Sequence, residues 1–269
     1  MDAVLCRTVV TGAAPAWVGD RLNAEPHEGR IVHAGSDAIY FTSDDDVIGV
    51  TSRHATSIPC AVATRLERLE ELFDGERLPP IGGAISLGAG AARLAGTDIR
   101  IGRFLNFQMR PFSLDAAPQM RARLTELLGV PASEELSEKD LTGLSHHPAA
   151  ALPSVLGKGT GLTPFGDDVV CGLLATLLAA GVPGARDLRE RALELAAART
   201  TPLSATLLRR AGAGDVLPAF ARVVSDLSTG SDRLTASVSN LRAIGHTSGA
   251  GMLLGLHLGL THITTRSCS

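Results

Sequence analysis

Short β-prone runs separated by Gly, Asp and Pro follow one another through the first 115 or so residues. Runs of this kind, bounded by turn residues, predict strands, here at 4–10, 31–42, 47–51 and 99–107. Gly35-Ser36-Asp37 interrupts the second run and predicts a hairpin turn. Two helices, at 14–22 and 63–73, are expected between the strands.

The pattern changes after this region, where apolar residues recur at helical spacing. Helices are expected at 119–128, 169–180, 185–198, 203–211, 216–227, 232–244 and 249–260. A strand-rich N-terminal half and a predominantly helical C-terminal half predict an α+β fold rather than an alternating βαβ sheet. We therefore expect a strand-rich domain over residues 1–115 and a helical domain over residues 116–269.

Composition narrows the classes of protein to which the chain can belong. Of its 269 residues, 45% are hydrophobic and 20% are charged, as in an ordinary globular protein. A net charge of −3 and an aromatic content of 3% argue against a nucleic-acid partner and an acidic membrane. The first residues lack the features of a signal peptide, and the longest apolar run, 169–182, is too short to span a bilayer. We therefore expect a cytoplasmic protein.

Cysteine and histidine spacing gives no metal signature. Cys6, Cys60, Cys171 and Cys268 lie far apart, without a CxxC pair or a Cys/His cluster, which predicts reduced thiols. The adjacent residues His146 and His147 precede Pro148, and neighbours in a flexible loop rarely coordinate one metal together. No metal ligands are therefore assigned.

The segment from Gly157 to Asp168 carries the strongest candidate chemistry. Its alternating glycines, Gly157, Gly159 and Gly161, allow backbone amides to surround an anion. An apolar helix follows directly, so that its N-terminal amides lie beside the loop. The other candidate residues of this segment are Lys158, Thr160, Thr163, Gly166, Asp167 and Asp168.

A simpler interpretation is a glycine-rich turn in which Asp167 and Asp168 cap the helix. Known phosphate motifs do not explain the segment, because the residue order fits neither a P-loop nor GxGxxG. Three glycines, two threonines, a proline and paired aspartates exceed what a helix cap requires, and this favours a binding site.

Two further segments join small polar residues to a helix start. Thr200, Thr201 and Ser204 follow Arg199, and they could cap a helix or bind a carboxylate or phosphate. Both interpretations stay open. Gly245-His246-Thr247-Ser248-Gly249 is either a tight helix corner or an anion-binding helix start, and the hydroxyls favour the second. His246 is its candidate proton donor or carbonyl polariser.

Three such loops in one helical half predict that several helix N-termini converge around a small, charged anion. In order and spacing the loops resemble a bacterial family with the pattern Gly-x-Gly-x-Gly-Leu-Thr-Pro-x-Gly-Asp-Asp, then Thr-x-x-Ser, then Gly-His-Thr/Ser-Ser-Gly. This family includes a subunit of oxamate carbamoyltransferase that works with two other subunits. The resemblance implies carbamoyl transfer between carbamoyl phosphate and a small acceptor such as oxamate, with partner subunits.

Roles for the candidate residues follow from this chemistry, which depends on positioning and on preorganised donors. The amides of Gly159 and Gly161, with Lys158 and Thr163, would bind phosphate or carboxylate. Asp167 or Asp168 could orient the acceptor amine, accept its proton or hold Mg²⁺. His246, with Thr247 or Ser248, could polarise the carbonyl group.

Two alternatives and one departure accompany this hypothesis. A non-catalytic anion-binding or scaffolding subunit would bind ligands without turnover. A nucleotide-dependent phosphotransferase would use the glycines for phosphates and the aspartates for Mg²⁺. Family members commonly have an Asp shortly after Gly249, where this chain has Gly251 and Met252. The small-residue helices also make self-association conceivable.

Overall fold

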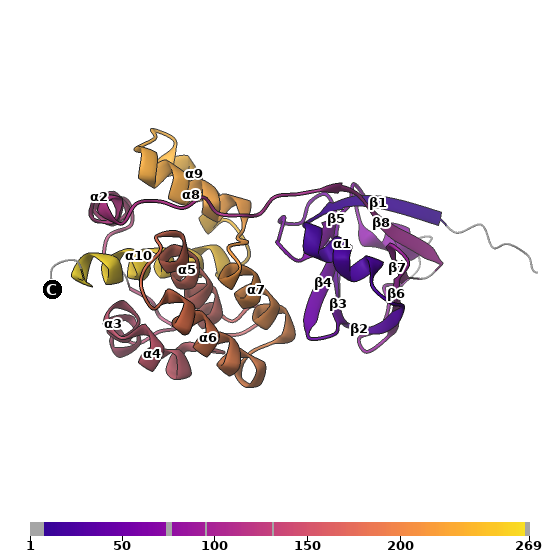
Figure 1. Ribbon diagram of the computed structural model, residues 1–269. Helices are drawn as coiled ribbons and strands as arrows, with labels where there is room; N and C mark the ends of the chain where they lie inside the picture. The colour runs from indigo at the N-terminus through magenta and orange to yellow at the C-terminus, as the bar shows by residue number, and fades with distance from the viewer. Residues whose placement is uncertain (1–7, 74–76, 95, 131, 267–269) are drawn as a thin grey trace, which may run out of the picture. The chain divides into compact units, whose positions relative to one another are not determined.

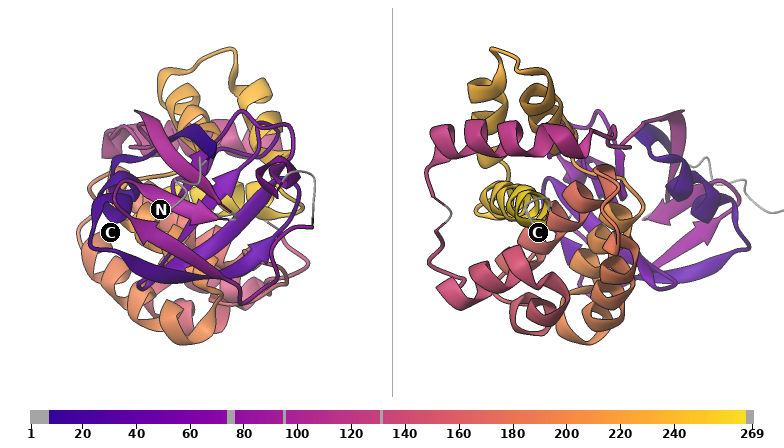
Figure 2. Two further views of the ribbon diagram at one scale, coloured as in Figure 1. Left: turned by 90° about the vertical axis from the view of Figure 1, so that its right-hand side faces the viewer. Right: turned by 60° about the vertical axis from the view of Figure 1, so that its left-hand side comes forward.

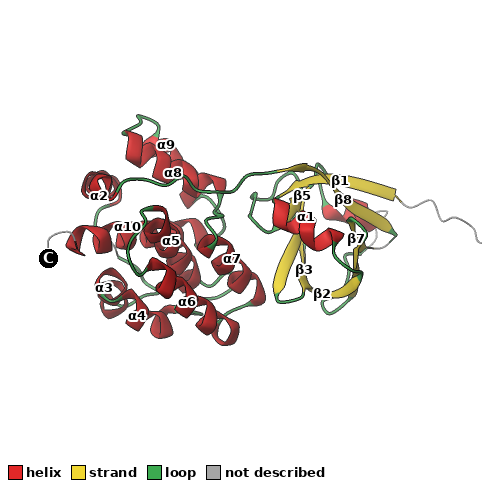
Figure 3. Cartoon of the chain, in the orientation of Figure 1, coloured by secondary structure: helices red, strands yellow, loops and turns green. Residues whose placement is uncertain are grey.

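The computed structural model describes residues 8–73, 77–94, 96–130 and 132–266. It forms two compact units, Met1–Asn106 and Phe107–Ser269. Figure 3 shows the strands in the first unit and most of the helices in the second. Each unit has its own core and is described by itself below.

The first unit is a closed eight-stranded barrel with the strand order β1-β5-β4-β3-β2-β6-β7-β8, in which β8 pairs with β1 (Figure 1). Most pairs are antiparallel, but β1 lies parallel to β8, and β4 lies parallel to β5. The strands are β1 Thr8–Ala14, β2 His27–Ala34, β3 Ala38–Ser43, β4 Asp46–Thr51, β5 Ala61–Ala63, β6 Ala84–Gly88, β7 Ala91–Leu94 and β8 Thr97–Phe104.

Apolar side chains from alternate strand positions fill the barrel, together with one face of α1 (Ala16–Asn23). Phe41, Ile39, Ile48, Ile85 and Ile99 are fully or almost fully buried there. The barrel core also takes Leu69 and Leu72 from the 3₁₀ helix η1 (Leu69–Phe73).

The fold class expected from the sequence needs correction. The strand-rich N-terminal half expected from the sequence is a closed β-barrel. Some neighbouring strands of this barrel are far apart in the sequence. The helix expected at 63–73 is wrong, since β5 ends at Ala63 and only the short η1 follows. The hairpin turn at Gly35-Ser36-Asp37 is confirmed between β2 and β3. Residues 4–7 of the first expected strand, with Cys6 and Cys268, lie outside the described residues.

The second unit is helical and is built around two helices, α5 (Phe165–Ala179) and α10 (Ser248–Arg266). The right-hand view of Figure 2 looks nearly along α10, with other helices of this unit around it. They are α2 Ala117–Leu128, α3 Glu138–His146, α4 Pro148–Val155, α6 Ala185–Arg199, α7 Pro202–Gly212, α8 Pro218–Thr229 and α9 Leu234–Arg242, and the short 3₁₀ helix η2 (Leu114–Ala116) precedes α2. The sequence missed α3 and α4. None of the described helices is long and apolar enough to cross a membrane.

Glycines set the spacing between α5 and α10. A Cβ atom on Gly255 would lie 2.1 Å from the carbonyl oxygen of Val169, and one on Gly172 would lie 2.4 Å from that of Met252. Gly251 lies against Asp168, and Gly259 lies against Thr176. Contacts therefore advance in the same direction along both helices, so α5 and α10 run parallel and their N-termini lie at the same end.

Gly255→Ala is expected to lower the free energy of unfolding by about 3 kcal/mol, because its Cβ would overlap the backbone of α5. Gly259→Ala is the matched control. Its Cβ would meet the Thr176 side chain at 3.0 Å and the carbonyl oxygen of Leu173 at an ordinary 3.5 Å, and the gain in helix propensity offsets that crowding. Urea unfolding of both variants measures the difference. Equal losses would contradict a backbone-limited contact at Gly255.

Candidate functional site

The glycine-rich loop connects α4 to α5, and its conformation requires the glycines. Gly157, Gly159 and Gly161 have φ values of +80°, +105° and +89°. A Cβ on Gly157 would lie 2.1 Å from the carbonyl oxygen of Arg199, and one on Gly159 would lie 2.6 Å from the amide nitrogen of Phe165. Gly161 has open space around it. The first two glycines therefore permit close backbone contacts, whereas the third permits only the left-handed turn.

Asp167, in the first turn of α5, links this loop to α7 and to the connection between α6 and α7. Its Oδ1 accepts a hydrogen bond from the amide of Gly157 at 2.8 Å. Its Oδ2 accepts hydrogen bonds from Ser204 Oγ, at 2.8 Å, and from Thr200 Oγ1. Burial raises the pKa of Asp167, while these three hydrogen bonds oppose the shift. Because both oxygens are occupied, the side chain of Asp167 holds the site together.

Asp168 is the carboxylate with an unsatisfied oxygen. Its side chain is buried, and its Oδ2 has no hydrogen-bond partner among the described residues. Burial raises the pKa of Asp168 to about 7, and the negative charge of Asp167 adds to this shift. The hydroxyls of Ser248 and Thr163 oppose it. A carboxyl group in this environment can exchange a proton near neutral pH.

The three loops singled out in the sequence meet around this pair of aspartates. Thr163 Oγ1 and Ser248 Oγ are 2.9 Å apart, which joins the glycine loop to the start of α10. Thr201 Oγ1 donates to the carbonyl oxygen of Leu162 at 2.5 Å, which joins the same loop to the start of α7. The N-termini of α5, α7 and α10 thus lie together, as the sequence predicted.

The open part of the loop presents backbone donors. Among the described residues, the amides of residues 159–163 have no hydrogen-bond partner, and Gly159, Thr160 and Gly161 are exposed. Successive free amides near a helix N-terminus form a concave surface that favours an anion. Glu135 borders this surface, since its Oε2 would lie 2.7 Å from a Cβ on Gly159. No motif in the sequence pointed to Glu135.

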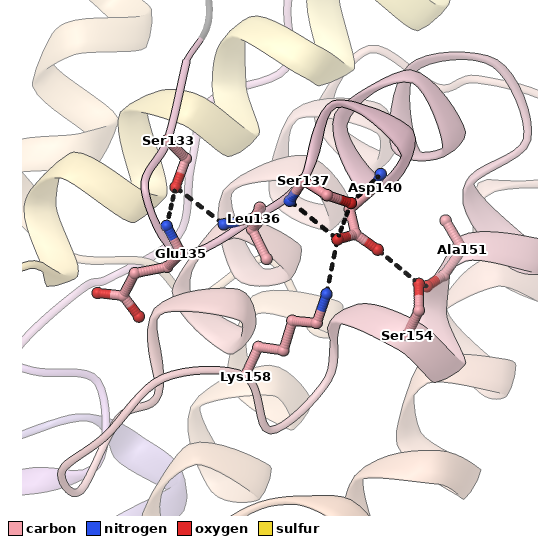
Figure 4. Close-up of polar contacts among 8 residues, drawn as sticks. All are labelled: Ser133, Glu135, Leu136, Ser137, Asp140, Ala151, Ser154 and Lys158. Carbon is pink, nitrogen blue, oxygen red and sulfur yellow. Dashed lines mark hydrogen bonds and ion pairs between the residues drawn. The ribbon is translucent and has the colours of Figure 1, made fainter.

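Lys158 is directed toward α3. Its Nζ lies 2.6 Å from Oδ2 of Asp140, a buried residue that forms a capping box with Ser137 at the start of α3 (Figure 4). Ser154 also donates to Asp140, at 2.8 Å. Although burial would raise its pKa, the hydrogen bonds from Lys158, Ser137 and Ser154 hold the pKa of Asp140 well below its ordinary value. Lys158 therefore anchors the beginning of the loop, and only the Ser137-x-x-Asp140 spacing could have signalled its partner.

The remaining candidates occupy the start of α10 and the first turn of α5. His246 is exposed, and its side chain makes no hydrogen bond to another described residue. The carbonyl oxygen of Thr247 accepts a hydrogen bond from Gly251 N at 2.9 Å. Gly249 and Gly166 are buried where a Cβ would lie 1.7 Å from the carbonyl oxygen of Leu241 and 2.1 Å from that of Val155, respectively. These two glycines allow backbone segments to pack closely.

No three His, Cys, Asp or Glu side chains of the described residues gather as a metal site would require. Asp168 could contribute one carboxylate oxygen to a cation held mainly by a substrate. Cys171 lies one turn further along α5, where burial raises the pKa of its thiol well above the ordinary value and the charges of Asp168 and Asp167 add to the shift. It is therefore a protonated, packed side chain.

The three loops lie within a segment that matches a known protein family. Residues 155–260 match the family of the oxamate carbamoyltransferase subunit AllH. The matched segment contains all three loops, which confirms the resemblance noted in the sequence over these residues. The AllH match does not extend to the barrel or to Asp140. No solved structure matches the chain.

Asp167→Ala is expected to lower the free energy of unfolding by about 3 kcal/mol, because the Gly157 amide and the Ser204 hydroxyl lose their partner in a buried setting. Asp232→Ala, at an exposed position, is the control and should change it by less than about 0.5 kcal/mol. Urea unfolding measures both values, and hydrogen exchange at the Gly157 amide reports the loop itself. Unchanged exchange in Asp167→Ala would show that Asp167 does not hold the loop.

Asp168 is expected to make stability depend on pH. Folding raises its pKa from 3.8 to about 7, so the folded chain holds the proton more tightly than the unfolded chain does. Its contribution is complete below the unfolded value and is lost as the pH rises through about 7. Asp168→Asn should therefore gain stability relative to the parent as the pH rises from about 4 to about 7, by at most about 4 kcal/mol.

Thermal unfolding across this pH range measures the effect, with Asp232→Asn as the control. A stability difference between Asp168→Asn and the parent that stays constant with pH would contradict the raised pKa.

Proposed function

We propose that the chain is a subunit of a carbamoyltransferase and that the junction of α5, α7 and α10 is its substrate site. The observation that carries the proposal is the buried Oδ2 of Asp168, which has no hydrogen-bond partner among the described residues and lies beside the Thr163 and Ser248 hydroxyls. The family matched by residues 155–260 supports the reaction class. The proposed donor is carbamoyl phosphate, and the proposed acceptor is a small amide such as oxamate.

Different residues of the site bind the substrates, orient them and transfer the proton. The free amides around Gly159, Thr160 and Gly161 bind the phosphate or the acceptor carboxylate, with the positive ends of the helix dipoles behind them. Thr163 and Ser248 donate hydrogen bonds that orient the bound anion. Lys158 contributes through its ion pair with Asp140, which fixes the first turn of the loop.

Carbamoyl transfer joins the acceptor nitrogen to the carbamoyl carbon and breaks the bond from that carbon to the phosphate oxygen. The acceptor nitrogen loses one proton, and the leaving phosphate can gain one. Asp168 takes the proton from nitrogen and returns it to phosphate, because a carboxylate with a pKa of about 7 serves as both base and acid. His246, exposed at the start of α10, polarises the carbamoyl carbonyl together with Thr247.

A non-catalytic, anion-binding subunit is the second candidate, because the matched family is described as one subunit of an enzyme. The same amides would then bind a substrate group whose reaction is completed on a partner chain. The two candidates differ in whether Asp168 changes turnover or only binding.

Thermal stabilisation of the purified chain by carbamoyl phosphate and by oxamate is the first expected result. A ligand at one hundred times its dissociation constant adds about 2.7 kcal/mol. Transfer from carbamoyl phosphate to oxamate, assayed with the partner subunits, should fall by about 10²–10⁴-fold in Asp168→Asn. Asp232→Asn should leave both measurements unchanged.

The other outcomes select among the alternatives. Stabilisation by ATP–Mg²⁺ alone would favour a phosphotransferase. Ligand binding with full turnover in Asp168→Asn would favour the non-catalytic subunit. An absence of any ligand effect would remove the claim of a substrate site on this chain.

A further inference from the structure

A cavity of about 560 Å³ in the helical unit lies at the opposite end of α5 from the aspartate pair. It is bordered by the α3–α4 junction, by the connection from α5 to α6 and by the last turns of α10. Leu177 of α5 contributes to its wall. Because nine residues separate Leu177 from Asp168 on one helix, the two places are about 14 Å apart along its axis.

Among the ionisable side chains around this cavity, basic ones outnumber acidic ones. His146, His147, Arg191, His262 and Arg266 line it, whereas Asp187 is its only acidic lining residue among those described. Arg191 also forms an exposed pair with Glu194 at 3.2 Å, and such a pair contributes little to stability. The remaining wall is apolar and includes Leu177, Val182 and Leu188.

Two helix N-termini open toward the same space without a side-chain cap. α4 begins at Pro148 after His147, and α6 begins at Ala185 after Gly184. The amides of Ala149 and Asp187 belong to these first turns, and both residues line the cavity. Neither amide has a hydrogen-bond partner among the described residues. Uncapped first-turn amides are donors suited to an anion.

His262 lies in the wall of this cavity, close to several other basic side chains. Its Nδ1 lies 2.9 Å from the carbonyl oxygen of Ser145, so Nδ1 carries the proton and Nε2 is left without a described partner. Burial lowers the pKa of His262, and Arg266, His146 and His147 lower it further, against the hydrogen bond to Ser145. Nε2 of this buried histidine is therefore a polar atom at the cavity wall that a ligand can contact.

We propose that this cavity binds a small organic anion. Arg191, Arg266 and the first-turn amides of α4 and α6 hold its carboxylate or phosphate group, and its apolar body packs against Leu177, Val182 and Leu188. This site is separate from the proposed substrate site and does not depend on carbamoyl transfer.

Calorimetric titration of the full chain with phenyl phosphate, benzoate and benzyl alcohol tests the proposal. The two anions should bind one site per chain, with at least about tenfold weaker binding in Arg191→Gln and in Arg266→Gln. Ala149→Trp, at an exposed position on the rim, should abolish binding by filling the cavity. Arg186→Gln, on α6 but outside the lining, is the matched control and should bind as the parent does. Asp168→Asn should also bind normally, which separates this site from the substrate site.

Three results would overturn the proposal. One is the absence of binding by both anions. Another is binding of benzyl alcohol as tight as that of the anions, which would show an apolar cavity only. The third is equal weakening in Arg186→Gln, which would show general charge attraction. Thermal unfolding of each variant checks that it is folded.

Discussion

The close approach of α5 and α10 is the constraint on which the helical unit depends. Gly172 and Gly255 bring the backbone of one helix against the other, and a larger residue at either position would separate them. Gly251 and Gly259 lie along the same contact, against the side chains of Asp168 and Thr176. Because the two helices run parallel, the same contacts bring their N-termini together. Thr163 and Ser248 can therefore share a hydrogen bond although they lie far apart in the sequence. The close approach of α5 and α10 therefore determines both the packing of the helical core and the geometry of the candidate site.

Within that geometry, two adjacent carboxylates receive different environments. Asp167 has both oxygens engaged by a backbone amide and two hydroxyls, so its interactions stabilise the junction of the loop, α6 and α7. Asp168 is also buried, but one of its oxygens has no hydrogen-bond partner in the part of the chain that the structure describes. A helix turns about 100° per residue, which sends neighbouring side chains in different directions. Asp167 therefore has a structural role, whereas Asp168 can exchange a proton. Mutation of Asp167 should lower the free energy of unfolding, and mutation of Asp168 should change how that free energy depends on pH.

Local signals explain what the sequence could predict. Glycine spacing, hydroxyls before a helix and helical periodicity identified all three loops, and the contacts bring them together. The pairing of Lys158 with Asp140 was missed, because the Ser137-x-x-Asp140 spacing indicates a capped helix start but does not say which lysine pairs with the aspartate. Barrel closure was also missed, since the parallel pairing of β1 with β8 joins segments that no short-range pattern connects. The 63–73 region shows packing overriding propensity, because Leu69 and Leu72 enter the barrel core from a single short turn.

Gly251 limits the chemistry that this site can perform. A Cβ at this position would lie 2.8 Å from the Cβ of Asp168 and 3.2 Å from the carbonyl oxygen of Phe165, so a second carboxylate here would force α10 away from α5. It would also repel Asp168, whose pKa is already raised to about 7. With glycine, Asp168 has one acidic neighbour whose oxygens are occupied. A single available carboxylate oxygen can exchange a proton, but it gives a divalent cation only one ligand, so any such cation would depend on oxygen atoms brought by the substrate.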